Sequence, residues 1–281
     1  MDRGWVVACR HGSVLGVPCD GCDAEIAMCG RFALDVTGSE IAAAFADGLG
    51  AIPGLEIGSA ADWSPRWNIA PTQVAPVIRR GGDGGLRLDS LRWGLVPSWS
   101  GDPGIGSRMI NARSESVHEK PSYREPFRVT RCIVPIRAFY EWTSMGGVKV
   151  PHAVRGGDGD LLALAGLWTR ADRIPGAEGD GMLESFTILT TAPNASFASI
   201  HDRMPVILDG GDRGAWLDHR SESEGGPTPS RLRGMLRACD DRRLRWHPVS
   251  NRVNRTSVDE AMLLSKCEAG DGGRQPGLFD S

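Results

Sequence analysis

A series of short apolar runs, separated by Gly, Pro and Asp, restricts the fold of this chain more than any other feature. The runs "QVAPVIRR" and "LRLDSLRW" flank the Gly-rich segment "GGDGG", which is a hairpin signal. Four more runs follow, namely "RCIVPIRAFYEW", "HAVR", "LLALAGLW" and "SFTILTT". Their short links favour antiparallel pairing over crossover helices.

Helical patterns flank this strand-rich part. The segment "TGSEIAAAFADGLG" predicts a short helix that Thr37 or Ser39 caps and that Gly48 and Gly50 end. Later helical patterns are "ASFASIHD", "RGAWLDHR", "SRLRGMLRACDD" and "VDEAMLLSK". We therefore expect an α+β fold, a single domain with a central antiparallel, barrel-like β core and flanking helices.

The chain of 281 residues divides into three parts by composition. Residues 1–28 form a Cys-rich leader that we do not expect in the mature protein, residues 29–267 form the domain, and residues 268–281 form a flexible tail. Within the domain, residues 221–230 are expected to form an exposed loop, since they contain almost nothing apolar to bury. No run is long and apolar enough to span a membrane, and the leader lacks the pattern of a secretory signal, so a cytoplasmic location is predicted.

Seven scattered cysteines do not form a paired framework, which favours reduced thiols. Cys9, His11, Cys19 and Cys22 could together hold zinc, but their spacing is irregular, so we predict no metal and no cofactor.

The formal net charge of −3 argues against a nucleic-acid partner at first sight. Residues 62–155, however, carry fourteen Lys and Arg against eight Asp and Glu. A basic face on a nearly neutral protein is therefore one interpretation, and a solvated Arg-rich surface is the other.

Polar residues stand beside apolar or aromatic ones at several expected strand ends. They lie in "MCGRFA", "WNIAPTQ", "INARSES", "FYEW" and "SIHDRMPV". Each alone has a structural explanation, because a single Glu beside Trp is usually paired or exposed and a single His is usually structural.

In combination, these segments resemble a known family. The motifs "MCGRFA", "NIAPTQ", "WGLVPSW", "INARSESV", "KPSYREPF", "RCIVPIRAFYEW", "LAGLW", "FTILTT", "IHDRMPVIL" and "HPVSNRVN" are similar, in order, to those of the SRAP domain, the abasic site processing or SOS response-associated peptidase family. The resemblance covers residues 28 to about 255. It implies DNA repair in the SOS response and a family classed as peptidase or hydrolase, with lyase activity as a further option. We expect a nucleoid-associated protein that acts as a monomer, because a single-site DNA clasp needs no partner.

The resemblance also implies roles for individual residues. Cys29 would form a covalent link to an abasic site in single-stranded DNA, Glu141 and His201 would transfer protons, and Asn111 would orient the Cys29 amine or the sugar. Arg31 and Arg113 would hold phosphates, and Pro71 and Trp142 would contact bases. Trp67, Trp93 and Trp99 are expected in the core or at its rim.

The link requires a free amine on Cys29. An α-amine beside a thiol can condense with the aldehyde of a ring-opened abasic site and close a thiazolidine. If residues 1–28 stay attached, that nitrogen is an amide. We therefore expect the working protein to begin at Cys29, through initiation at Met28 with Met removal or through processing of the leader.

The C-terminal "QPGLF" fits a QxxLF pattern. It resembles the peptide that bacterial replication proteins insert into the sliding clamp, with Gln275, Leu278 and Phe279 as the contacts. A random tail is the alternative.

Two other functions stay open. One is a thiol hydrolase or self-processing peptidase with Cys29 as nucleophile, His201 as base and Glu141 as orienting group. The other is a non-covalent DNA-binding module, for which Cys29→Ala would leave function intact.

Overall fold

The computed structural model describes residues 30–46, 49, 54–172, 174 and 181–267. The strands are β1 (Phe32–Leu34), β2 (Leu55–Ile57), β3 (Arg66–Ile69), β4 (Val74–Arg80), β5 (Leu86–Trp93), β6 (Asn111–Arg113), β7 (Arg131–Ile136), β8 (Ala138–Met145), β9 (Val148–Gly156), β10 (Leu162–Ala171), β11 (Leu183–Thr191), β12 (Met204–Pro205) and β13 (Leu244–Pro248). The α-helices are α1 (Gly38–Phe45), α2 (Arg124–Val129), α3 (Gly210–Leu217) and α4 (Pro229–Gly234). The 3-10 helices are η1 (Pro103–Arg108), η2 (Phe197–Ser199), η3 (Glu222–Glu224), η4 (Asn251–Asn254) and η5 (Ala261–Leu264).

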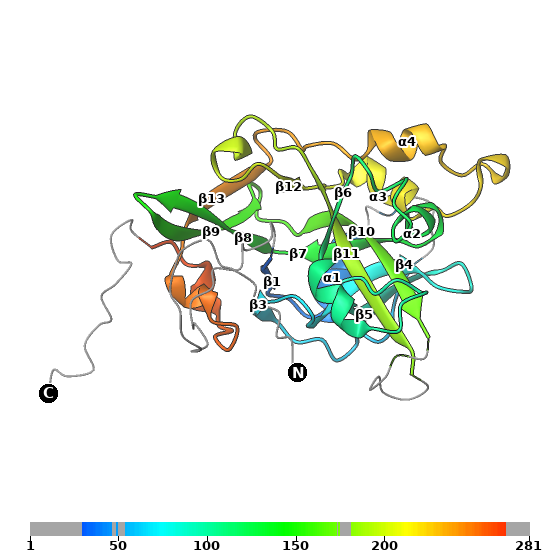
Figure 1. Cartoon of the computed structure of the whole chain (residues 1–281), viewed down its shortest axis with the longest axis horizontal. Helices are drawn as coiled ribbons and strands as arrows, with labels where there is room; N and C mark the ends of the chain where they lie inside the picture. The colour runs from blue at the N-terminus through cyan, green and yellow to red at the C-terminus, as the bar shows by residue number, and fades with distance from the viewer. Residues whose placement is uncertain (1–29, 47–48, 50–53, 173, 175–180, 268–281) are drawn as a thin grey trace, which may run out of the picture.

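Five strands close into a barrel, in the order β11, β10, β7, β4 and β5 (Figure 1). Four of the contacts around this ring are antiparallel, and the fifth, between β5 and β11, is parallel. A closed ring with an odd number of strands cannot alternate direction throughout, so one parallel contact is required. The predicted α+β class and barrel-like core are confirmed, with this parallel closure as the addition.

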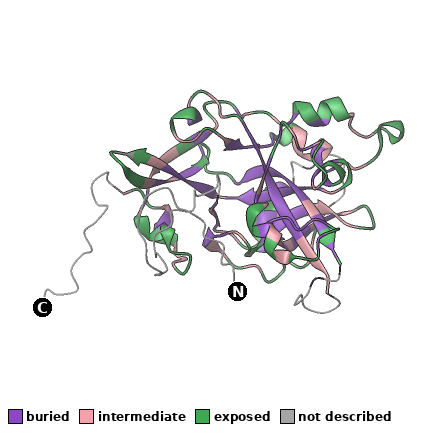
Figure 2. Cartoon of the chain, in the orientation of Figure 1, coloured by how far each residue is buried: buried purple, intermediate pink, exposed green. Residues whose placement is uncertain are grey.

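Most residues of the barrel strands are buried and are purple in Figure 2, as expected for a small barrel whose interior is filled by side chains. At the closure, Trp93 and Phe186 are fully buried, and their rings stack with centroids 6.5 Å apart. Burial of two such side chains contributes on the order of several kcal/mol. This packing makes the closure a stable part of the core.

A second sheet has the order β13, β9, β8, β1 and β3. The run "RCIVPIRAFYEW" supplies both sheets, because the chain leaves β7 at Ile136 and enters β8 at Ala138. Between them, Arg137 donates its backbone N–H to Ala33 and its Nε to Asp35 at 2.7 Å. The sheet switch therefore positions "FYEW" next to β1.

Local signals in the sequence gave the correct elements at several places. The hairpin around "GGDGG" forms as β4 and β5. In α1, the Thr37 hydroxyl accepts the backbone N–H of Glu40, and the Glu40 carboxylate accepts the backbone N–H of Thr37, which completes a capping box.

Two predicted helices are wrong in type. "ASFASIHD" forms only η2, and "VDEAMLLSK" forms only η5. In the first, Phe197 is buried against Phe139 and Trp246, and in the second, the Asp259 carboxylate binds backbone groups of β3. These tertiary contacts override the weak preference of a short segment for α-helix.

The exposed loop predicted at residues 221–230 is mostly exposed, with η3 inside it and the start of α4 at its end. No helix in the described part of the chain is both long and apolar enough to cross a membrane.

Candidate functional site

The predicted site residues come from separate elements. Asn111 is the first residue of β6, Glu141 lies within β8, and His201 follows η2. Cys29 lies outside the described residues, directly before Gly30, which is buried.

The pairing of β1 with β8 brings the start of the domain beside Glu141. Phe32 is opposite Phe139, and Tyr140 donates its backbone N–H to the Arg31 carbonyl at 2.9 Å. Arg31 therefore lies beside Tyr140, the residue before Glu141, and Glu141 is only 2% exposed.

Aromatic contacts beneath the site join its four segments. The rings of Phe32 and Trp93 are 4.9 Å apart, and the Trp93 indole donates to the carbonyl of Ile110, the residue before Asn111. The rings of Phe139 and Phe197 are 5.8 Å apart, which joins the strand of Glu141 to the turn that carries His201. The fold therefore fixes the relative positions of "GRF", "INAR", "FYEW" and "IHDR".

At the C-terminal end of β11, the segment "INARSES" lies on one side of the strand and the segment "IHDRMP" on the other. Thr190 is opposite Arg113 of β6 on one side and pairs with β12 on the other. Arg203 forms a bidentate ion pair with Glu115, at 2.6 and 2.9 Å, and also donates to the Thr190 carbonyl. The Arg203 guanidinium lowers the pKa of Glu115. Arg113 is exposed at this end of β6, so it is accessible to an anionic ligand.

His201 has a partly buried side chain with 25% exposure. Burial, followed by the positive charge of Lys149, lowers its pKa despite the nearby Asp202 carboxylate. Its Nδ1 is 2.8 Å from Asp202 Oδ1 and 3.0 Å from the Arg203 backbone N. A protonated Nδ1 donates to Asp202, whereas a bare Nδ1 accepts from Arg203. Both states of this nitrogen have a partner, which suits a group that transfers protons.

Arg31 and Trp142 are engaged with the C-terminal part of the domain. Arg31 Nη1 donates to Asn68 Oδ1 at 2.9 Å and to the Val253 carbonyl at 2.8 Å, and burial lowers its pKa. The Trp142 indole, 8% exposed, donates to Asn254 Oδ1 at 2.9 Å. The predicted phosphate contact of Arg31 would therefore come from a guanidinium that already has partners within the protein.

Pro71 lies in the turn after β3, and the following Thr72 has a φ of +70°. A β-branched residue rarely adopts this left-handed conformation. The turn is closed by the bond from the Gln73 N–H to the Ala70 carbonyl, which fixes the partly exposed Pro71 ring.

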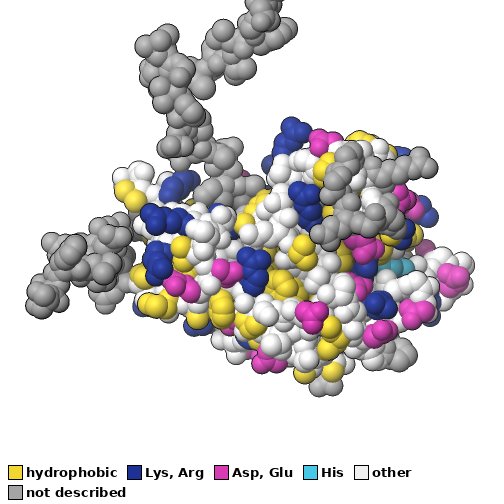
Figure 3. Space-filling view, turned by 90° about the horizontal axis from the view of Figure 1, so that it is seen from below, with side chains coloured by type: hydrophobic (Ala, Val, Ile, Leu, Met, Phe, Trp, Pro, Cys, Tyr) yellow, Lys and Arg dark blue, Asp and Glu magenta, His cyan; other side chains and the backbone are white. Residues whose placement is uncertain are grey.

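The three tryptophans expected in the core or at its rim differ in exposure. Trp93 is in the core, Trp67 is partly buried in β3, and Trp99 is exposed. On the face in Figure 3, Lys and Arg side chains alternate with hydrophobic ones and do not form one continuous basic stripe.

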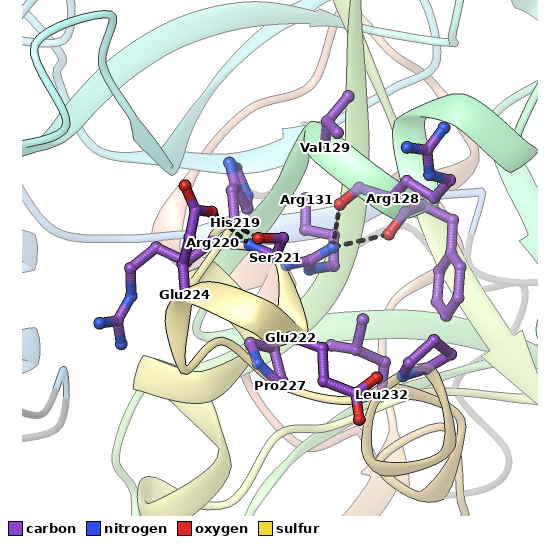
Figure 4. A pocket seen from close by; sticks show the side chains of 12 residues that line it. Arg128, Val129, Arg131, His219, Arg220, Ser221, Glu222, Glu224, Pro227 and Leu232 are labelled. Carbon is purple, nitrogen blue, oxygen red and sulfur yellow. Dashed lines mark hydrogen bonds between the residues drawn. The ribbon is translucent and has the colours of Figure 1, made fainter.

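A cavity of about 350 Å³ lies between α2 and the segment from His219 to Leu232 (Figure 4). It contains none of the predicted site residues. The Arg131 guanidinium at this cavity is buried and donates to the carbonyls of Trp216, Phe127, Arg128 and Asp218. We therefore assign it a structural role that joins α2 to the end of α3.

The described residues contain no group of three or more His, Cys, Asp and Glu that could hold a metal ion. The proposed zinc ligands of the leader and the tail residues Gln275, Leu278 and Phe279 lie outside the described residues.

The sequence did not predict that Asn254 or Asp259 contacts the candidate site. Asn254 stands in the quoted motif "HPVSNRVN", which was the available signal, and Asp259 follows it without a motif of its own.

Comparison with known proteins identifies the same family that the sequence motifs indicate. A model of the family described as SOS response associated peptidase (SRAP) matches residues 28–256. The abasic site processing protein YoaM of Bacillus subtilis is 36% identical over 239 residues, which cover 84% of this chain and 97% of YoaM. YedK of Escherichia coli, also named an abasic site processing protein, is 30% identical over 241 residues, which cover 84% of this chain and 99% of YedK. A crystal structure of a Bacteroides thetaiotaomicron protein superposes with a TM-score of 0.71 at 21% identity, covering 85% of this chain and all of that one, and so supports the fold.

Proposed function

Because the chain belongs to the SOS response associated peptidase (SRAP) family, we propose that it captures abasic sites in single-stranded DNA through a thiazolidine link to Cys29. Its similarity to proteins named abasic site processing proteins supports this class of substrate. The observation that carries the proposal is the pairing of β1 with β8, in which Arg31, two residues after Cys29, lies beside Tyr140, the neighbour of the buried Glu141.

The reaction releases one water molecule. The Cys29 amine attacks C1 of the ring-opened sugar, and loss of water gives an imine. The thiol sulfur then adds to C1, its proton passes to the nitrogen, and the five-membered ring closes. The amine has an unperturbed pKa of about 8, against about 10.4 for lysine, so it is a useful nucleophile near neutral pH.

Each step needs a proton transfer. We assign these transfers to Glu141 and His201, which come from segments joined by the contact of Phe139 with Phe197. Asn111 would orient the amine or the sugar, since its strand is held on β11 beside the Trp93 contact. Arg31 and Arg113 would bind phosphates, and Pro71 and Trp142 would pack against neighbouring bases.

A test uses protein that starts at Cys29, an oligonucleotide with one abasic site, and a denaturing gel. We expect a shifted band that is absent in Cys29→Ala and slower to form in Glu141→Gln and His201→Ala. Cys267→Ala is the matched control, because this partly exposed cysteine lies elsewhere in the chain and should not affect the band. Cys29→Ser should give a band only after reduction with borohydride, because its amine can form an imine but has no thiol to close the thiazolidine.

Two results would support other functions. A stable complex that forms equally well with Cys29→Ala and disappears on denaturation indicates a non-covalent DNA-binding module. Cleavage that persists when the Cys29 amine is acetylated indicates a thiol hydrolase or self-processing peptidase, which the family description and the polar contacts of His201 favour as the second candidate.

The proposal also requires that residues 1–28 are absent from the working protein. The match to the family begins at Met28, which supports a start of the mature chain at Cys29. The intact mass of the native protein tests this point, since a chain that keeps residues 1–28 and still forms the link would contradict it.

For the tail, we propose binding to the sliding clamp through Gln275, Leu278 and Phe279. Its sequence combines one amide side chain with an apolar pair. A tail peptide should bind the clamp, and the variants Leu278→Ala and Phe279→Ala should not. Equal binding by all three peptides would refute this proposal.

A further inference from the structure

Residues 249–267, which we name the C-terminal strap, pack against the sheet that carries Glu141. Val249, Val253 and Leu263 of the strap are buried in one cluster with Ala33, Tyr140, Trp142 and Ala153. The strap lies below β8 and β9 in Figure 1, where η4 and η5 are orange to red. Its polar contacts with the site region are at β3, at Arg31 and at Trp142.

The first contact is at β3, the edge strand of this sheet. Asp259 Oδ1 accepts the backbone N–H groups of Trp67 at 2.5 Å and Asn68 at 3.0 Å. Its other oxygen pairs with Arg66 Nε at 2.6 Å. One carboxylate therefore binds two backbone N–H groups and one guanidinium of the edge strand β3.

The second contact joins the strap to Arg31. The fully buried Asn68 uses Nδ2 to donate to the carbonyls of Val253, Arg255 and Val258, and its Oδ1 accepts from Arg31. Arg31 itself donates to the Val253 and Asn254 carbonyls. The strap is therefore hydrogen-bonded directly to Arg31, the residue two positions after Cys29.

The third contact joins the strap to Trp142. Asn254 Oδ1 accepts the indole N–H at 2.9 Å, and Trp142 directly follows Glu141 in β8. A side chain of this size has two χ angles, and the bond from Asn254 selects one orientation of the ring.

We propose that Asn254 and Asp259 are positioning residues for the abasic-site reaction, acting through Trp142 and Arg31. This rests on the function proposed above. Neither residue reacts; they fix the orientation of the start of β1 and of the Trp142 ring. Asp259 lies beyond residue 256, where the match to the family ends. The contact of the strap with β3 through Asp259 is therefore outside the matched range.

The test compares four variants of protein that begins at Cys29, well below their unfolding temperatures. Asn254→Ala removes the acceptor for the indole, and Asn254→Asp keeps it. Asp259→Ala removes the anchor on β3, and Glu260→Ala is its matched control, since the neighbouring Glu260 pairs only with the exposed Arg252 among the ion pairs of the described chain. Cross-linking is followed as a single-turnover rate constant over a range of oligonucleotide concentrations.

Loss of the single bond to Trp142 should lower the saturating rate constant by about fivefold in Asn254→Ala, and loss of the three contacts of Asp259 should lower it by at least as much in Asp259→Ala. Asn254→Asp should restore the rate, and Glu260→Ala should equal the wild type. Equal rates in all folded variants would overturn the proposal, as would failure of Asn254→Asp to restore the rate.

A second measurement, hydrogen exchange, tests the positioning role independently of the proposed abasic-site reaction. Hydrogen exchange at the Trp142 indole should accelerate in Asn254→Ala, and exchange at the Tyr140 amide, which binds the Arg31 carbonyl, should accelerate in Asp259→Ala. If the wild type forms no link, the proposed function fails, and exchange alone decides the positioning. Unchanged hydrogen exchange in both variants would overturn the positioning proposal, whatever the cross-linking gel shows.

Discussion

Replacement of Asn68 by Ala is the most informative change to the fold around the site. Asn68 is fully buried, with Nδ2 at 3.2, 3.0 and 2.7 Å from the carbonyl oxygens of Val253, Arg255 and Val258. Its Oδ1 accepts from Arg31 at 2.9 Å. Because the amide has two N–H groups for three acceptors, truncation removes the equivalent of about three hydrogen bonds.

The expected loss of stability follows from the number of hydrogen bonds that Asn68→Ala removes. Each bond contributes about 1 kcal/mol, and the buried carbonyls left behind add a further cost, so Asn68→Ala should lower the free energy of unfolding by about 3 to 4 kcal/mol. For a domain of this size, each kcal/mol lowers the melting temperature by about 2 to 4 °C, which gives a decrease of about 6 to 16 °C.

Urea unfolding and calorimetry measure both quantities. The exposed Asn251 is the matched control, and Asn251→Ala should change the free energy of unfolding by no more than about 0.5 kcal/mol. Asn68→Asp, which keeps the acceptor but turns a carboxylate toward three carbonyls, should destabilise at least as much as Asn68→Ala. A loss below about 1 kcal/mol in Asn68→Ala would refute the view that this side chain holds the strap to β1 and β3.

Three further predictions concern pH and backbone conformation. Burial lowers the pKa of His219 to about 3, so below about pH 6.5 the unfolded chain binds a proton that the folded chain does not, and stability falls by up to about 1.4 kcal/mol per pH unit. His219→Gln should flatten this slope in urea unfolding between pH 7 and 5, and an unchanged slope would contradict the assignment. Glu115 has the same sign at lower pH: Arg203 lowers its pKa, so its stabilisation is present above about pH 4.3 and is lost as the pH falls through the folded-state pKa. Glu115→Gln should therefore destabilise the protein at pH 7 and less at pH 3, whereas an equal loss at both pH values would exclude the ion pair as the cause. Thr72→Gly should keep or raise the melting temperature, because glycine relieves a conformation that costs a threonine about 1 kcal/mol or more, and a marked decrease would show that the turn is not strained.

The sequence predicted those parts of the fold that depend on neighbouring residues. The "GGDGG" turn sits between two apolar runs, and Thr37 stands three residues before Glu40, so hairpin and cap follow from local chemistry. The membership in the SRAP family was also predicted correctly, because ten short motifs in order carry more information than any one of them.

What the sequence could not give were contacts between distant segments. Arg31 and Val253 are 222 positions apart, and nothing in either segment indicates their bond. The same holds for Asp259, whose carboxylate binds the β3 edge and leaves its segment as η5 and not an α-helix. The sheet switch at Arg137 depends on Asp35 and the Ala33 carbonyl, which only the folded chain brings to it.

The most direct test of the central claim is the intact mass of the covalent product. Protein that begins at Cys29 is mixed with a single-stranded oligonucleotide that carries one abasic site, and the product is weighed without reduction. We expect a mass equal to the protein plus the oligonucleotide minus one water, and no such product when the Cys29 amine is acetylated. A product that still forms on the acetylated chain, or a link that maps to a residue other than Cys29, would contradict it.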